Sequence, residues 1–267
     1  MKHLSIDDAP APAFGLAERL TPGVGPWHQH SRHQLLYAAS GIMTLELDDA
    51  AWTLPPQRAA WIHADTVHRV CLTRPVELRA VYLSPSFCPS VCADARVFAV
   101  DELTRQLLLA SVRFGPTRAP DDALANDLLR TLAGLAREHA ARAEPTRLPR
   151  PHDPQLARAV AHALHHLHEP VTIADIARAA GLSERSLHRK LVADCGLNPQ
   201  QLLHTARMVR AMELLDDPAV PVSEASLRAG FLSLGSFSSA FRRFTGLSPS
   251  EWRRRDSPLP DTIGAAH

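Results

Sequence analysis

A group of basic residues near residue 185 has the clearest capacity for chemistry in this sequence. Leu187 and Leu191 are four residues apart, so both side chains lie on one face of a helix. Arg185, His188 and Arg189 then project from the opposite face. A guanidinium group can donate two parallel hydrogen bonds to O6 and N7 of guanine. The segment is therefore a candidate for reading base edges in duplex DNA.

A second segment further along the chain repeats this design. Phe237, Phe241 and Phe244 are the apolar anchors, and Leu234 on the polar face could contact a thymine methyl group. Lys190 in the first segment and Arg243 in the second are expected to meet backbone phosphates. The candidate DNA-contacting residues are Arg185, Ser186, His188, Arg189, Lys190, Leu234, Ser236, Ser238, Ser239, Arg242 and Arg243.

Each of these helices follows a shorter predicted helix and a tight turn. Gly181 and Gly230 supply a residue that tolerates positive φ, and Ser183 and Ser233 can cap the helices that follow. This order of elements is the helix-turn-helix arrangement. An ordinary helical bundle is the alternative, but the duplicated spacing of cap, glycine and anchors favours two helix-turn-helix units.

Capping signals predict five further helices in the same region. Asp153 with Pro154, and Asn198 with Pro199, each pair an N-cap residue with proline at the first helical position. The other predicted starts are Thr172, Ser223 and Ser248–Pro249. The helix that begins at Asn198 is the longest and separates the two helix-turn-helix units.

The proline-rich segment 144–154 predicts a domain boundary, because four prolines in eleven residues cannot continue a helix. We expect a sensor domain over 1–144, a linker over 145–154 and a DNA-binding domain over 155–257. Short alternating apolar runs predict an antiparallel barrel or sandwich in the sensor domain. The predicted strands are 33–37, 42–47, 51–54, 59–63, 68–72 and 76–83.

Two helices should follow these strands, at 101–114 and 121–144. The second has an apolar face formed by Leu124, Leu128, Leu132 and Leu135. This face would either pack on the strands or form a dimer contact. The fold class is therefore α+β with two domains.

Bulk composition restricts the class of protein. The 267 residues are 45% hydrophobic and 21% charged, with a net charge of only +1. No apolar run is long enough to span a bilayer, and the N-terminus lacks the apolar segment of a signal peptide, so we expect a cytoplasmic protein. The four cysteines (Cys71, Cys88, Cys92 and Cys195) form no CxxC pair and are expected to be free thiols.

Residues 153–255 closely resemble the DNA-binding domain of the AraC/XylS family of bacterial transcription regulators. The resemblance is carried by Gly230-Phe231, Ser236-Phe237, Phe241-Arg242-Arg243-Phe244, Gly246 and Ser248-Pro249-Ser250-Glu251-Trp252-Arg253-Arg254. It implies that two recognition helices, held apart by the long helix, enter successive major-groove segments about 34 Å apart. It also implies a homodimer, and a contact with RNA polymerase if the protein activates transcription.

Two positions depart from the family pattern. Ser239 stands where the family commonly has arginine, and Ser226 where it commonly has alanine. The first departure removes a base-reading side chain from the second unit. We therefore expect the first unit to discriminate between sequences more strongly, while the second positions the DNA backbone.

The N-terminal third resembles the cupin-like sensor domain found in part of the same family. His28, His30 and His68 match the histidines with which cupins bind a metal, whereas Gln34 stands near the position of their glutamate. Three imidazoles could hold Zn, Ni or Cu, or they could be polar groups of a pocket rim or core. The other matching residues are Trp27, Gln29, Gln34-Leu35-Leu36-Tyr37, Ser40-Gly41, Pro55-Pro56 and Trp61-Ile62.

Two functions follow from these patterns. The first is a one-component regulator at bacterial promoters, whose N-terminal domain responds to an effector that is either a metal ion or a small organic molecule. The alternative is a metal-binding cupin enzyme that acts on a small molecule. No acid–base pair accompanies the three histidines in the sequence pattern, which favours the regulator. The target promoter and the direction of regulation stay open.

Overall fold

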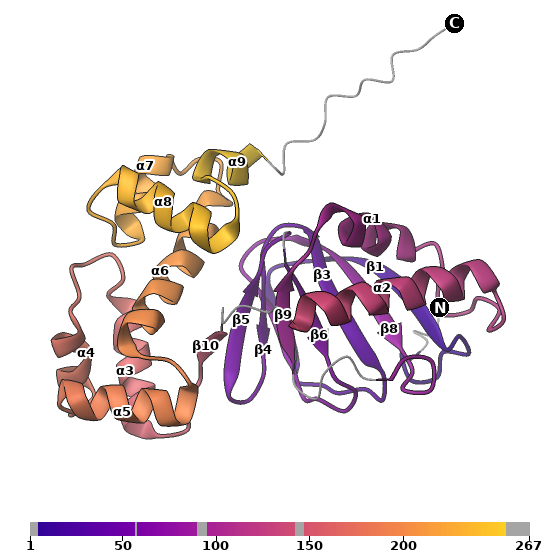
Figure 1. The fold of residues 1–267 in the computed structure, drawn as a ribbon, viewed down its shortest axis with the longest axis horizontal. Coiled ribbons are helices and arrows are strands. Elements are labelled where there is room, and N and C mark those ends of the chain that lie inside the picture. The colour runs from indigo at the N-terminus through magenta and orange to yellow at the C-terminus, as the bar shows by residue number, and fades with distance from the viewer. Residues whose placement is uncertain (1–4, 57, 90–94, 142–146, 255–267) are drawn as a thin grey trace, which may run out of the picture. The chain divides into compact units, whose positions relative to one another are not determined.

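The chain folds into two compact units, Met1–Arg150 and Pro151–His267. The computed structural model describes residues 5–56, 58–89, 95–141 and 147–254 (Figure 1). Cys92, residues 142–146 and residues 255–257, which belong to expectations above, lie outside the described residues. Within the described ranges, no helix is both long and apolar enough to cross a membrane.

In the described residues, the strands of the first unit form two five-stranded sheets whose pairings are all antiparallel. The first sheet has the order β1-β8-β3-β6-β9 and the second has the order β10-β5-β4-β7-β2. The strands are β1 Ala13–Leu20, β2 Gly23–Val24, β3 His33–Ser40, β4 Met43–Glu46, β5 Ala50–Leu54, β6 Arg58–Ile62, β7 Arg69–Leu72, β8 Val76–Leu83, β9 Arg96–Ala99 and β10 Arg147–Pro149.

The first sheet is buried on both faces, because successive side chains of a strand point to opposite sides. In β3, Leu36 packs with Met43 and Leu45 of the second sheet, so one core lies between the two sheets. Leu35 and Tyr37 point the other way and pack with residues of the two helices that follow the strands. This double burial explains why the strand carries a continuous apolar run rather than an alternating one.

Helices α1 (Glu102–Ser111) and α2 (Ala123–Ala141) cover the outer face of the first sheet (Figure 1). The buried face of α2 includes only part of the predicted one. Leu132 is buried and Leu128 packs against the same core, whereas Leu124 is 64% exposed. Ala125 and Leu129 are fully buried, so the face that packs on the sheet is rotated from the leucine stripe. Packing on the sheet therefore accounts for this buried face.

The α+β class with two domains is confirmed, and the barrel-or-sandwich expectation resolves to two packed sheets. Among the described strands, no pairing closes these sheets into a continuous barrel. Part of the segment expected to be a linker is a strand: β10 pairs with Ala50–Trp52 of β5 at the edge of the second sheet. An edge tolerates proline because one side of the strand needs no ladder hydrogen bond.

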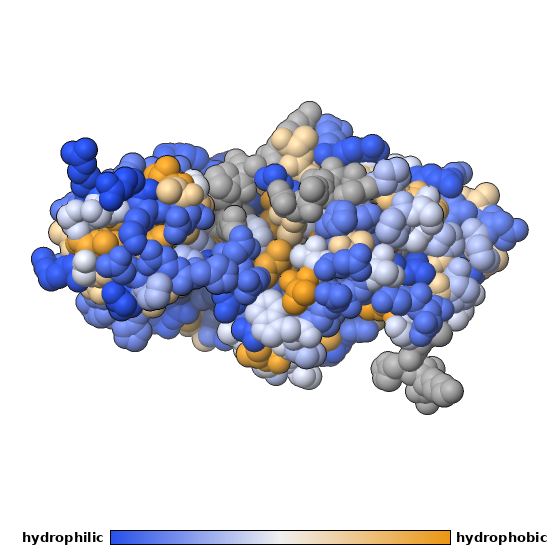
Figure 2. All heavy atoms as spheres, turned by 90° about the horizontal axis from the view of Figure 1, so that it is seen from below, coloured by the Kyte–Doolittle hydropathy of each residue, from blue (hydrophilic) through white to orange (hydrophobic). Residues whose placement is uncertain are grey.

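The second unit is helical, and its long helix α6 supports the other helices. Eleven of the seventeen residues of α6 are buried, and α6 contacts α3, α5, α7, α8 and α9. The described helices are α3 Pro154–His165, α4 Ile173–Ala179, α5 Glu184–Cys195, α6 Pro199–Leu215, α7 Val222–Arg228, α8 Leu234–Thr245 and α9 Pro249–Arg254. Figure 2 shows a face of the molecule on which hydrophilic side chains predominate and hydrophobic ones gather only in small groups.

The predicted caps agree with the structure at all but one helix. Asp153, Thr172, Ser183, Asn198 and Ser233 each accept a hydrogen bond from the first turn of their helix. The start predicted at Ser223 is wrong, because α7 begins one residue earlier and its N-cap is Pro221, which has no side-chain acceptor.

Candidate nucleic-acid interface and effector site

Helix α5 presents a basic surface over an apolar base. The Ser183 hydroxyl accepts a hydrogen bond from the Ser186 amide at 3.2 Å, which fixes the start of the helix. Leu187 and Leu191 are fully buried. The residues expected to read bases lie on the outer face: Arg185, His188 and Arg189 are exposed and Ser186 is half-buried.

Lys190 differs from the other candidates of α5 because it already has an anionic partner. Its ammonium group lies 2.5 Å from Oδ2 of Asp153 and donates to Oε1 of Gln155 at 3.0 Å. Hydrogen bonds from Lys190 and from the amides of Gln155 and Leu156 hold the pKa of Asp153 below its usual value. Lys190 therefore ties α5 to the start of α3, which the expectation of a phosphate contact did not include.

Helix α8 has the same construction with aromatic anchors. Phe237 and Phe241 are fully buried, and the Phe241 ring meets Trp252 edge-on at a centroid distance of 5.3 Å. The third anchor, Phe244, is half-buried. The outer residues Leu234, Ser236, Ser239, Arg242 and Arg243 are exposed, and Ser238 is half-buried.

The turn of the second helix-turn-helix unit contains a residue that the sequence patterns did not single out. Leu232 lies between Phe231 and the cap Ser233 and is 94% exposed. Its neighbour Phe231 packs against Phe237 at a ring distance of 5.3 Å. A signal was present in the sequence, because the second turn has one more residue between glycine and cap than the first.

The two turn glycines are in different surroundings. Both adopt the left-handed conformation, with φ of 68° at Gly181 and 82° at Gly230. A Cβ built on Gly181 meets nothing within 4 Å, whereas one built on Gly230 would lie 2.1 Å from the Leu167 carbonyl oxygen. Gly230 is therefore required for close packing as well as for backbone conformation.

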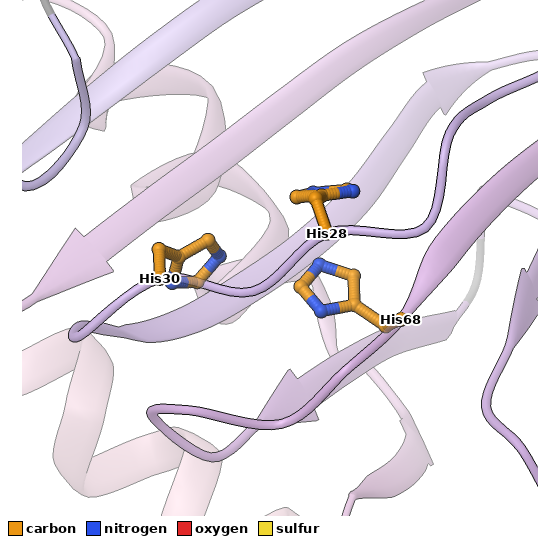
Figure 3. Close-up of side chains that lie close together, drawn as sticks. All are labelled: His28, His30 and His68. Atoms are coloured by element: carbon orange, nitrogen blue, oxygen red, sulfur yellow. The ribbon is translucent and has the colours of Figure 1, made fainter.

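The first unit brings His28, His30 and His68 together (Figure 3). Figure 3 shows the His68 ring pointing from its own segment toward the segment that carries the other two. The chain segments are joined by a bridge in which His28 and His68 exchange two backbone hydrogen bonds of 2.9 Å. One ligand atom from each ring can be chosen so that all three lie within 4.8 Å of one another.

Each of these rings is oriented by a backbone carbonyl. Nδ1 of His28, His30 and His68 donates to the carbonyl oxygens of Pro26, Arg32 and Thr66 at 3.1, 2.7 and 2.8 Å. A neutral imidazole that donates from Nδ1 keeps a lone pair on Nε2, and this is the usual second contact of a metal-binding histidine. The local backbone therefore sets all three rings in the ligand tautomer.

Gln34 completes the set of donor atoms. Its Nε2 donates to the Tyr82 hydroxyl at 3.0 Å, and its Oε1 lies 3.2 Å from Nε2 of His30. These two atoms form a hydrogen bond when Nε2 carries a proton, whereas in a ring protonated only on Nδ1 both are acceptors and can face a cation. Burial lowers the pKa of His68 to about 4, so this imidazole is neutral at ordinary pH.

A charged cluster lies beside the histidines, and we name it the Glu46 cluster. The Glu46 carboxylate accepts from Arg69 Nε at 2.7 Å and pairs with Arg150. Burial raises the pKa of Glu46, but the hydrogen bonds from the two arginines outweigh it and hold the pKa below its usual value. The Arg69 guanidinium also stacks on Trp27 at 4.6 Å. The cluster thus links the neighbours of His28 and His68 to Arg150, the last residue of the first unit.

Two family models match this chain. Residues 14–192 match the AraC-like ligand binding domain, a match that covers more than half of the chain. Residues 157–255 match a helix-turn-helix domain.

Curated relatives match over most of the chain. The activator RhaS of Escherichia fergusonii is 27% identical over 96% of this chain and 98% of its own length. The probable transcriptional regulator LumQ of Photobacterium leiognathi is 23% identical over 85% of this chain and 91% of its own length. These families and relatives are transcription regulators and not enzymes.

Solved structures that match this chain include ToxT of Vibrio cholerae. It is 13% identical, with a TM-score of 0.41, and the match covers 93% of this chain and 99% of ToxT. The DNA-binding domain of AdpA in complex with a target DNA is 39% identical, with a TM-score of 0.36, over 38% of this chain and 90% of that domain.

Proposed function

Because this chain belongs to the AraC family of transcription regulators, we propose that α5 and α8 are the recognition helices with which it reads its promoter. The outer faces of the two helices hold the residues assigned to DNA. The first helix-turn-helix unit discriminates between bases through Arg185 and Arg189. The second helix-turn-helix unit mainly positions the DNA backbone through Arg242 and Arg243.

The observation that supports this assignment best is the surface of α5. A well-capped helix buries two leucines completely and leaves two arginines and a histidine exposed on its opposite face. Among the residues that the structure describes, neither arginine forms an ion pair, whereas Lys190 is paired with Asp153. The basic face is therefore available to the electronegative O6 and N7 edge of guanine.

The test is sequence selection by the full chain. Binding sites would be selected from random duplexes, and affinity would be measured for the selected site and for a scrambled duplex. The Arg185→Ala/Arg189→Ala variant should lose the preference for the selected site. The control Arg19→Ala/Arg105→Ala removes the same charge from the N-terminal unit, Met1–Arg150, and should keep the preference for the selected site. An unchanged preference in the α5 variant would contradict the proposal.

For the N-terminal ligand-binding domain, we propose a divalent metal of the Zn, Ni or Cu type at His28, His30, His68 and Gln34. Nitrogen-rich donor sets suit these borderline metals. The 3.2 Å separation of His30 Nε2 and Gln34 Oε1 is close to the distance of about 3.3 Å between neighbouring ligands around tetrahedral zinc. The bound ion would be an effector, and a small organic effector in the same domain is the competing assignment.

Metal analysis of the purified full chain tests this assignment. About one equivalent of metal should be retained after dialysis, and His68→Gln should lose it. His162→Gln/His166→Gln, which removes two histidines of the second unit, serves as the control. Retention of metal by His68→Gln, or its absence from the wild-type chain, would refute the metal site.

Regulation requires that the effector bind two states of the protein with different affinities. We propose that the Glu46 cluster connects the histidines to the start of the second unit through Arg150. Glu46→Gln should then reduce the effect of metal on DNA binding while leaving metal affinity unchanged. The protein would act as a homodimer in the cytoplasm, and one that activates transcription would also contact RNA polymerase.

A further inference from the structure

Leu232 is the large apolar side chain with the greatest exposure among the described residues, at 94%. Its exposure follows from the extra residue in the second turn. In the first helix-turn-helix unit, Leu182 is the single residue between Gly181 and the cap Ser183, and it is half-buried. In the second unit, two residues occupy the corresponding interval, and only one of them can fill the space over the core.

Phe231 takes the place that Leu182 occupies in the first unit. The Leu182 amide donates to the Ala177 carbonyl at 2.8 Å, and the Phe231 amide donates to the Ser226 carbonyl at 3.0 Å. The Phe231 ring then packs on Phe237, the first anchor of α8. An apolar residue just before a helix cap normally makes this contact with the fourth helical residue. Leu232 is therefore displaced outward.

The position of Leu232 places it at the tip of α8. It directly precedes the cap Ser233, and the residues of the first turn that follow, Leu234, Gly235 and Ser236, are all exposed. The Ser236 hydroxyl donates to the Ser233 carbonyl at 2.9 Å, which leaves the two leucines as the most prominent groups of this tip. The N-terminal turn of a recognition helix is the part that meets base edges.

We propose that Leu232 is a specificity-determining residue that packs against the 5-methyl group of a thymine in the major groove. The thymine methyl is the apolar feature that base edges present there. The inference rests on the proposed reading of DNA by α8. DNA is favoured over a protein partner because the neighbouring exposed side chains of α8, Ser236, Ser239, Arg242 and Arg243, suit phosphates and sugars.

Deoxyuridine tests this contact, because it differs from thymidine only by the missing methyl group. Each thymine of a duplex selected by the full chain would be replaced singly, and affinity measured for each duplex. At one position in the half-site of the second unit, the replacement should weaken wild-type binding about fourfold, the value of one buried methyl group. Leu232→Ala should bind the thymine and uracil duplexes equally at that position.

Two matched variants separate the contributions of neighbouring leucines. Leu227→Ala removes a leucine that is 62% exposed on α7 and should keep the full response to uracil. Leu234→Ala should keep the response to uracil at the thymine assigned to Leu232. If Leu234 contacts a thymine of its own, this variant should lose the response at that other position. Leu232→Ser should behave as Leu232→Ala, which excludes a helix-propensity effect because the residue precedes the helix.

The outcomes distinguish this inference from the proposed function. If the full chain selects no sequence, the proposed reading of DNA fails and this inference with it. If it selects a sequence but Leu232→Ala keeps the full response to uracil at every thymine, only the role of Leu232 is overturned. Loss of transcription by Leu232→Ala with that response intact would identify the leucine as a protein-docking residue and also overturn the inference.

Discussion

Counted from their cap residues, α5 carries Arg185 and Arg189 where α8 carries Gly235 and Ser239. The apolar anchors nevertheless correspond: Leu187 and Leu191 in α5 match Phe237 and Phe241 in α8, and all four are fully buried. One turn later the basic residues are in the other helix. There α8 has Arg242 and Arg243, where α5 has the exposed residues Val192 and Ala193.

This difference separates two requirements of a DNA-reading helix. The cap, the turn glycine and the anchors hold the helix on its support, and they are the same kind of residue in both units. The outer residues, which we assign to DNA, differ between the two helices. On our proposal, base reading is concentrated in the first unit and backbone contact in the second, with one apolar contact added by Leu232.

The turn glycines offer the largest expected effect. Gly181→Ala should cost about 1–2 kcal/mol of stability, because alanine is strained at positive φ but meets no neighbouring atom. Gly230→Ala adds a clash with the Leu167 carbonyl and should cost upwards of about 4 kcal/mol. Loss of helical circular dichroism on heating the full chain measures both. Equal losses would mean that the second turn relaxes away from the Leu167 carbonyl.

Base reading should be equally asymmetric. Arg189→Ala should weaken binding to the selected site by about 1–3 kcal/mol and relax the preference at one base pair. Ser239→Ala, at the matching position of α8, should change affinity by less than about 0.5 kcal/mol. Repeating the selection with each variant gives the preference at every position. A larger effect at Ser239 would reverse the roles that we assign to the two units.

Backbone contact should show the opposite asymmetry. Arg243→Ala should weaken binding to all sequences by about 1.5 kcal/mol and lower the slope of log affinity against log salt by about one. Lys190→Gln should leave the slope unchanged, because the ammonium is paired with Asp153 rather than with phosphate. Titrations at several salt concentrations test both variants. A reduced slope for Lys190→Gln would show that this ion pair opens on DNA.

The first helix of each unit gives the smallest expected difference. Thr172 and Asp175 form a capping box at α4, so Thr172→Ala should cost about 1 kcal/mol. Ser223 caps nothing, since α7 begins after Pro221, and Ser223→Ala should change stability by less than about 0.5 kcal/mol. Thermal unfolding of the full chain compares the two. A comparable loss at Ser223 would indicate a contact outside the cap.

Local chemistry made much of the helical unit, Pro151–His267, predictable. Capping depends on residues three positions apart, so Ser183, Ser233, Thr172 and Asn198 could be identified without knowledge of the tertiary structure. The wrong start at Ser223 has the same origin, because a serine near the start of a helix indicates an N-cap even when its side chain makes no capping hydrogen bond. The histidines of the first unit were also named, although only the folded chain shows their carbonyl contacts.

Features that depend on distant packing were not predictable. The first sheet selects the buried face of α2, so the leucine stripe predicted the burial of Leu132 correctly but placed the exposed Leu124 on the same face. β10 has only three residues, including Pro149, and is a strand because β5 leaves an edge free for it. The exposure of Leu232 depends on which of two adjacent apolar residues fills one space, and periodicity does not decide this.

The edge position of β10 gives the connection to the second unit two available lengths. While 147–149 stay paired with β5 and the Arg150 amide donates to the Asp49 carbonyl, the free tether before α3 contains only Pro151, His152 and the cap Asp153. Detachment of 147–150 would extend it by up to about 14 Å, since an extended residue spans about 3.3–3.6 Å. Detachment would also break the pair between Arg150 and Glu46 and uncover the buried Pro149, so the interactions that hold β10 on the sheet set how far the helical unit can reach from the first.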